Sequence, residues 1–126
     1  PPKASSAVSR NARGADLLLH EALQPRLVAA LTRGLEARGA AGTAKITRDI
    51  LDYHATPEEA AETARDAGVD MLILTHIVPP LPSRAFHPAF LGDAPSRYAG
   101  PIVVGEDGLL FSLPAGSDAL EREDLL

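Results

Sequence analysis

Two stretches of the chain are built alike, GADLLLHE at residues 14–21 and DMLILTHI at residues 70–77. Each is a short apolar run followed by a histidine, as is typical of a strand buried in a parallel sheet. Ligands of open α/β sheets gather at the edge where the carboxyl ends of the strands meet, so His20 and His76 are candidate site residues. The alternative, a histidine that only packs and hydrogen-bonds at a strand end, stays open for both.

Two helices are predicted between these strands. The first begins near Pro25 and ends before Gly39, and its leucines, which recur every fourth position, are expected to face the core. These leucines are Leu23, Leu27, Leu31 and Leu35. The second covers residues 56–67, where the sequence TPEE forms a capping box and regularly spaced alanines form a face that can approach a sheet closely. This order of strands and helices indicates an α/β fold.

Three parts are expected along the chain: a connector at 1–13, a folded region at 14–113 and a fraying tail at 114–126. Six prolines between residues 77 and 101 predict a long ordered loop, because proline removes backbone donors. Two strands at 102–104 and 109–113, joined by a tight turn, are expected to complete the folded region.

Composition excludes several classes of function. The chain has 126 residues, 45% of them apolar, and no cysteine, which removes disulfides, thiolate zinc sites and cysteine nucleophiles. Its 12 basic and 17 acidic residues give a net charge of −5, which argues against a nucleic-acid module held by a basic face. No stretch approaches the roughly 20 apolar residues of a membrane span. The length suits one small domain or part of a larger one.

Three further side chains are candidates for chemistry. His54 lies just before the capping box, at the positive end of the second helix, or is simply an exposed loop residue. Glu21 either belongs to the site or caps the first helix, and His87 in the proline-rich loop faces solvent or a substrate edge. A catalytic zinc needs about three protein ligands. The four histidines are too widely spaced for a complete zinc site to be assigned from the sequence alone.

The order of these segments resembles the C-terminal half of a metallo-β-lactamase-fold hydrolase, on the branch that holds ribonuclease Z and zinc-dependent arylsulfatase-like enzymes. The matching segments are residues 14–22, 53–61, 74–76 and 105–108, and the likeness runs from about Ala12 to Leu113. It implies an α/β fold of the αββα sandwich family. This chain would supply about one half, a small sheet with two main helices, and would expose an apolar sheet face.

Residue roles follow from the resemblance. It implies that His76 binds one of two zinc ions, and that Glu21 orients His54, which protonates the departing oxygen. His20 would support the loop. The family's other metal ligands are absent from this sequence, and the family's bridging aspartate lies shortly before the position that corresponds to Pro1. We therefore expect the chain to begin just downstream of that aspartate.

Two functions from different classes are carried forward. The first is part of a zinc-dependent hydrolase that cleaves a phosphodiester, a sulfate ester or a related small ester with metal-activated water. The second is a catalytically incomplete fragment that serves as a binding or assembly half-domain; a weaker third is an unrelated α/β binding domain with structural histidines. The expected partner is the N-terminal half of the same domain or a second copy. The sequence IVPP at residues 77–80 departs from ribonuclease Z, and with the acidic charge it favours a small ester over nucleic acid.

Overall fold

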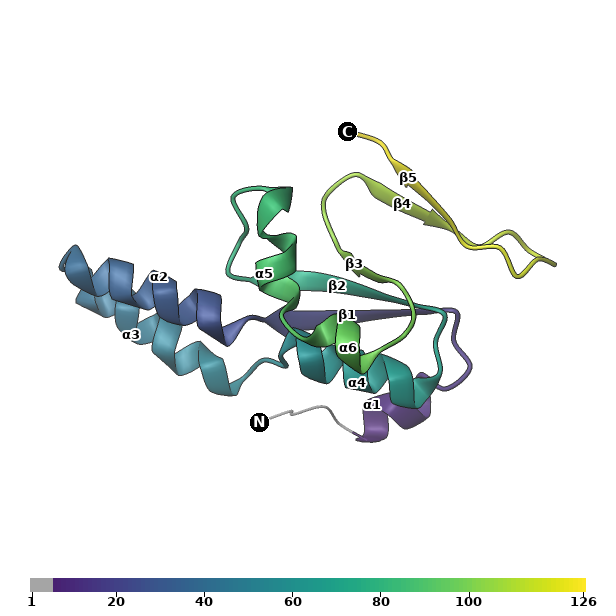
Figure 1. Ribbon diagram of the computed structural model, residues 1–126, viewed down its shortest axis with the longest axis horizontal. Helices are drawn as coiled ribbons and strands as arrows, with labels where there is room; N and C mark the ends of the chain where they lie inside the picture. Colours follow the sequence, from purple (N-terminus) through teal and green to yellow (C-terminus); the bar gives the residue numbers. More distant parts are fainter. Residues whose placement is uncertain (1–5) are drawn as a thin grey trace.

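A computed structural model describes residues 6–126, so residues 1–5 of the expected connector lie outside the described part. In the first two-thirds of the chain a run of helices separates two strands, and short helices and strands follow (Figure 1). In chain order the elements are α1 (Ser6–Asn11), β1 (Leu17–Leu23), α2 (Pro25–Ala37), α3 (Ala41–Asp49), η1 (Ile50–Asp52), α4 (Pro57–Ala67), β2 (Met71–Val78), η2 (Arg84–Phe86), α5 (His87–Leu91), α6 (Ala94–Arg97), β3 (Ile102–Val104), β4 (Leu109–Ser112) and β5 (Glu121–Asp124). The predicted α/β class is confirmed.

The centre of the fold is a three-stranded parallel sheet in the order β1-β2-β3. Leu18 of β1 pairs with Leu72 of β2, which pairs with Ile102 of β3. Both predicted apolar runs form strands of this sheet, as expected, with β2 at its centre and β1 at an edge. β2, however, extends to Val78, so His76 lies within the strand rather than beyond its end, because pairing with β1 continues past it.

Helix α4 covers one face of this sheet and forms the core with it (Figure 1). Its alanines, which include the fully buried Ala60, Ala61 and Ala64, pack in one cluster with Leu72 and Leu74 of β2. Small side chains let the helix approach the strands closely, which is what the alanine face predicts. The predicted capping box is also present, and it contributes about 1 kcal/mol to helix stability.

The opposite face of the sheet is partly open, as expected for one half of a sandwich. Leu19 on β1 is 61% exposed. A cavity of about 500 Å³ lies over this face, between the strands and β4. His76, Glu106 and Phe111 are among the residues that line it. No helix in the described part of the chain is long and apolar enough to cross a membrane.

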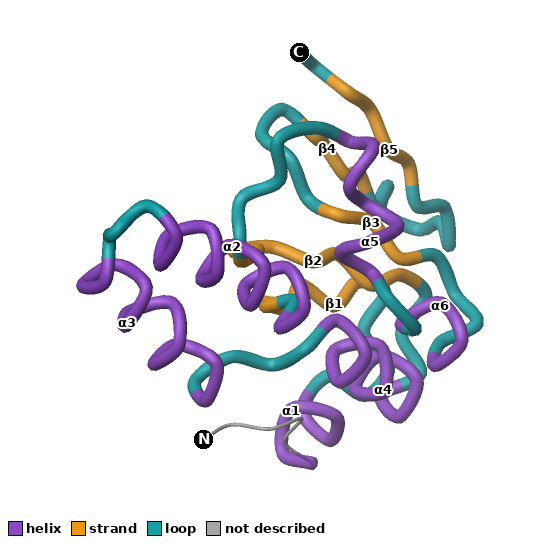
Figure 2. The backbone as a smooth tube through the Cα atoms, turned by 60° about the vertical axis from the view of Figure 1, so that its left-hand side comes forward, coloured by secondary structure: helices purple, strands orange, loops and turns teal. Residues whose placement is uncertain are grey.

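The expected role of the leucine face of α2 is confirmed only in part, because Leu23 is buried and Leu27 packs against the core cluster, whereas Leu31 does not. The residues that α2 buries are Val28 and Thr32, and Leu31 is 43% exposed. The reason is α3, a helix that the sequence did not predict, which packs along α2 as a helical hairpin set apart from the sheet (Figure 2). The hydroxyls of Thr32 and Thr47 are hydrogen-bonded at 2.7 Å between the two helices.

The proline-rich segment is not an irregular loop throughout, because it contains η2, α5 and α6. Pro88 and Pro95 lie in the first turns of α5 and α6, where proline's fixed φ and missing N–H suit a helix start. Phe90 of α5 is fully buried. Two prolines therefore start helices instead of preventing them.

The expected hairpin at the C-terminal end is also wrong. β3 pairs in parallel with β2, while β4 pairs antiparallel with β5, in a two-stranded sheet that stands apart from the first (Figure 1). Residues 121–124 of the expected tail form β5. Arg84 donates hydrogen bonds to Glu106 at 2.6 Å and to Asp124 at 2.7 Å, which ties β5 to the rest of the fold.

Candidate active site

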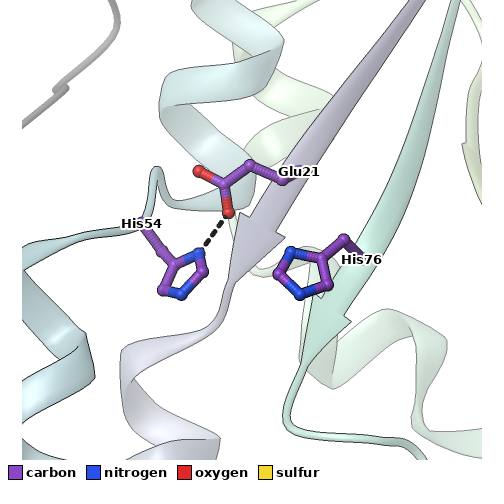
Figure 3. Close-up of side chains that lie close together, drawn as sticks. All are labelled: Glu21, His54 and His76. Carbon is purple, nitrogen blue, oxygen red and sulfur yellow. Dashed lines mark hydrogen bonds and ion pairs between the residues drawn. The ribbon is translucent and has the colours of Figure 1, made fainter.

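Three side chains from three segments lie close together near the carboxyl ends of β1 and β2 (Figure 3). Glu21 comes from β1, His76 from β2, and His54 from the loop that enters α4. The Glu21 Oε2 and His54 Nδ1 atoms are 2.7 Å apart, and the two imidazole rings are 5.6 Å apart between their centres. One ligand-type atom from each residue lies within 4.8 Å of the others.

Glu21 positions the loop that carries His54. Its Oε1 accepts a hydrogen bond from the backbone N–H of Ala55 at 2.7 Å, while its Oε2 is bonded to His54. The backbone N–H of Leu23 donates to the carbonyl of Ala55 at 2.8 Å and holds the same loop against β1. The alternative that Glu21 caps the first helix is wrong, because the side chain of Gln24 caps α2.

The pairing fixes the tautomer of His54. An ionised carboxylate only accepts hydrogen bonds, so Nδ1 of His54 carries a hydrogen and donates it to Glu21. The other ring nitrogen, Nε2, is then the atom available for chemistry.

His76 is presented by an irregularity of β2. Glu21 pairs with Thr75 and Ala22 pairs with Ile77, so His76 is an extra residue that has no partner on β1. Its φ is +45°, a left-handed backbone that costs a non-glycine residue about 1–3 kcal/mol. Bulges of this kind redirect side chains next to active sites. Nothing in the local sequence predicts this bulge.

The other two histidines lie outside the cluster. Nδ1 of His20 donates to the backbone carbonyl of Glu21 at 2.7 Å, which is the supporting position expected for it. His87 is half-buried and lies 3.2 Å from Glu106. Glu106 and Asp107, in the turn that belongs to the resembling segment 105–108, line the same cavity as His76, although no local signal marked them as site residues.

The cluster has the donor types of part of a metal centre. Imidazole and carboxylate are ligands that zinc accepts. Both oxygens of Glu21 are already hydrogen-bonded, and His54 uses Nδ1 for that pair. Of the three side chains, this leaves His76 and Nε2 of His54 as donors for a metal ion. A two-metal site needs further ligands.

No family model matches this chain. The curated proteins that it resembles are longer. A ribonuclease Z of Mycolicibacterium gilvum is 39% identical over 100 residues, which cover 76% of this chain and 29% of that protein. A ribonuclease Z of Mycobacterium tuberculosis is 34% identical over 96 residues, 76% of this chain and 31% of that protein. The chain thus spans about a third of the length of these relatives.

Among solved structures, the metallo-β-lactamase fold protein YhfI from Bacillus subtilis matches 94% of this chain and 36% of its own, with a TM-score of 0.53 and 17% identity. The chain is therefore part of a metallo-β-lactamase fold. Its sequence likeness makes it, within that fold, a ribonuclease Z-like protein. Both statements confirm the resemblance predicted from the sequence, while the arylsulfatase-like branch stays a prediction.

Proposed function

We propose that this chain supplies the leaving-group side of a zinc-dependent hydrolase that cleaves a phosphodiester or a related small ester. The observation that carries the proposal is the hydrogen bond between Glu21 and His54, beside His76. Glu21 and His76 lie on the parallel neighbours β1 and β2, and His54 lies in the loop that enters α4. The ribonuclease Z relatives favour a phosphodiester over a sulfate ester. They are about three times as long as the matched segment, so the whole activity belongs to a longer protein.

His54 is the general acid in this proposal. Its Nε2 gives a proton to the oxygen that departs, and Glu21 keeps the ring oriented through Nδ1. A positioned acid of this kind contributes about 10²- to 10⁴-fold to the rate. Glu21 acts through His54 and is therefore a positioning residue.

His76 is the metal ligand of this chain. A zinc centre, when bound, supplies an activated water and offsets the negative charge that develops in the reaction. The remaining ligands would come from the N-terminal half of the same domain or from a second copy, which would also cover the open face of the sheet. If neither completes the centre, the chain is a catalytically incomplete half-domain for binding or assembly.

The test uses a polypeptide that joins this chain to the metal-binding half. His76→Ala should lower the zinc content, and His54→Ala should keep zinc but slow hydrolysis of a phosphodiester about 10²-fold or more. Glu36→Ala is the control, because Glu36 is an exposed side chain that pairs with Arg48 on the helical hairpin, and it should change neither. Equal loss of zinc in the His54 and His76 variants would contradict the assigned roles.

The role of His54 can be separated from general damage by the leaving group. A nitrophenolate leaves without protonation, whereas an alkoxide does not. His54→Ala should therefore slow an alkyl ester far more than a nitrophenyl ester of the same phosphate. If the zinc-loaded protein hydrolyses neither phosphodiesters nor sulfate esters, the half-domain function takes the place of the enzyme.

A further inference from the structure

An apolar groove opens beside α2, separate from the three side chains of Figure 3. Its volume is about 360 Å³, and it is lined by Leu27 and Leu31 of α2, by residues 79–82 and by Phe86. None of these side chains carries a charge, and Leu31 and Phe86 are 43% and 44% exposed. Small-molecule sites are commonly apolar clefts of roughly 300–1,000 Å³.

The walls of the groove are held in place by the fold. Val28 and Thr32 face α3, which leaves the leucine side of α2 free to form one wall. Pro79, Pro80 and Pro82 form part of the other wall, and proline's fixed φ restricts their backbone. The groove is therefore largely preformed, so a ligand would pay little ordering cost on entering it.

The groove is lined by the segments that follow the two strands of the candidate active site, α2 after β1 and residues 79–82 after β2. In Figure 3, β1 runs past the three side chains and leads into α2, and β2 runs past them and leads into the loop that follows Val78. The backbone N–H of Gln24 donates to the carbonyl of Val78 at 2.8 Å, so the two walls are joined at their base. Pro79, which lines the groove, is three positions after His76, so their Cα atoms lie no more than about 11 Å apart.

We propose that this groove binds the apolar part of the leaving group, an aryl or alkylaryl group whose oxygen lies toward His54. This inference rests on the proposed function and specifies its substrate class. A polyanionic strand does not suit the groove, since its lining offers no cation and the chain carries a net charge of −5. Leu27 and Leu31, two of the four leucines expected in the core, thus line the proposed site.

The experiment compares two phosphodiesters, with phenyl and with 4-butylphenyl leaving groups, on the polypeptide that contains this chain and its metal-binding half. The two phenols have nearly the same acidity, so the chemical step is matched. We expect kcat/KM to be about tenfold higher for the butylphenyl ester, because the groove removes its methylenes from water. The difference should lie mainly in KM.

Two variants localise this preference. Leu31→Ser and Phe86→Ser should each remove most of the preference and leave the phenyl ester nearly unchanged. Ile46→Ser is the matched control, because Ile46 is 61% exposed on α3, in the same helical hairpin, and does not line the groove. An equal loss for both esters in the Leu31 variant would contradict the inference.

A binding measurement separates this inference from the proposed function. Calorimetry with 4-butylphenol needs no turnover and should show binding that Leu31→Ser weakens about tenfold, as expected for loss of buried apolar contact. Binding without any hydrolysis would keep the groove and refute the enzyme. Hydrolysis without a butylphenyl preference, or a dimer in solution that Leu31→Ser dissociates, would overturn the leaving-group site.

Discussion

Replacement of Glu21 by alanine tests whether this carboxylate holds the loop of His54 on the sheet. The change removes two hydrogen bonds of 2.7 Å, one from the N–H of Ala55 and one from His54. Hydrogen bonds to a charged group contribute about 1.5–3 kcal/mol each, but the Glu21 side chain is 30% exposed, so water replaces part of the loss. Ala55 is 1% exposed, and its N–H would lose its carboxylate partner.

We therefore expect Glu21→Ala to lower the free energy of unfolding by about 2 kcal/mol. For a chain of this size the corresponding fall in Tm is roughly 6–12 °C. Urea unfolding gives the free energy, and hydrogen exchange at the Ala55 amide gives the local effect. Glu21→Gln keeps an acceptor for that amide and should cost about half as much.

The matched control is Glu36→Ala, which removes an exposed glutamate that pairs with Arg48 on the surface of the helical hairpin. Surface pairs contribute about 0–1 kcal/mol, so this variant should unfold nearly like the parent protein. The reasoning is refuted if Glu21→Ala costs no more than Glu36→Ala. It is refuted equally if the Ala55 amide stays as protected as before.

Three other outcomes are expected. Phe90→Ala should lower the free energy of unfolding in urea by about 3–5 kcal/mol, because the ring is fully buried in the core. Gly92→Ala should cost about 1–2 kcal/mol in the same assay, because φ is +53° and an added Cβ would lie 2.4 Å from Oε1 of Glu58. The hydrogen bond from Arg84 lowers the pKa of Asp124. The stabilisation from this pair is therefore complete above the ordinary carboxyl pKa and is lost as pH falls through the lowered pKa. An NMR titration of the Asp124 carboxyl should show the lowered pKa, and Arg84→Gln should return it toward its ordinary value.

Much of the fold could be predicted because its signals are local. The two apolar runs became β1 and β2, and the capping box set the start of α4 at Pro57. The prediction failed where a neighbouring element changed the meaning of a pattern. A leucine repeat is the same in sequence whether its partner is a sheet or α3, and only the packing of Val28 and Thr32 tells the two apart.

The candidate site divides in the same way. Position at strand ends was enough to single out His20 and His76, and the resemblance added Glu21 and His54 as a pair. Glu21 and His54 are 33 residues apart in the chain, so their 2.7 Å contact depends on the parallel crossover that returns the chain to β1. No local pattern encodes that distance.

Residue order alone was sufficient for the α/β class, strands β1 and β2, helix α4 and the residue types of the site. The tertiary structure decided the bulge that presents His76, the tautomer of His54 and the groove between α2 and residues 79–82. The physical reason is the distance along the chain over which each interaction acts. Hydrophobic period and helix capping act over a few residues, whereas strand register and helix packing depend on contacts between segments that only the folded chain brings together.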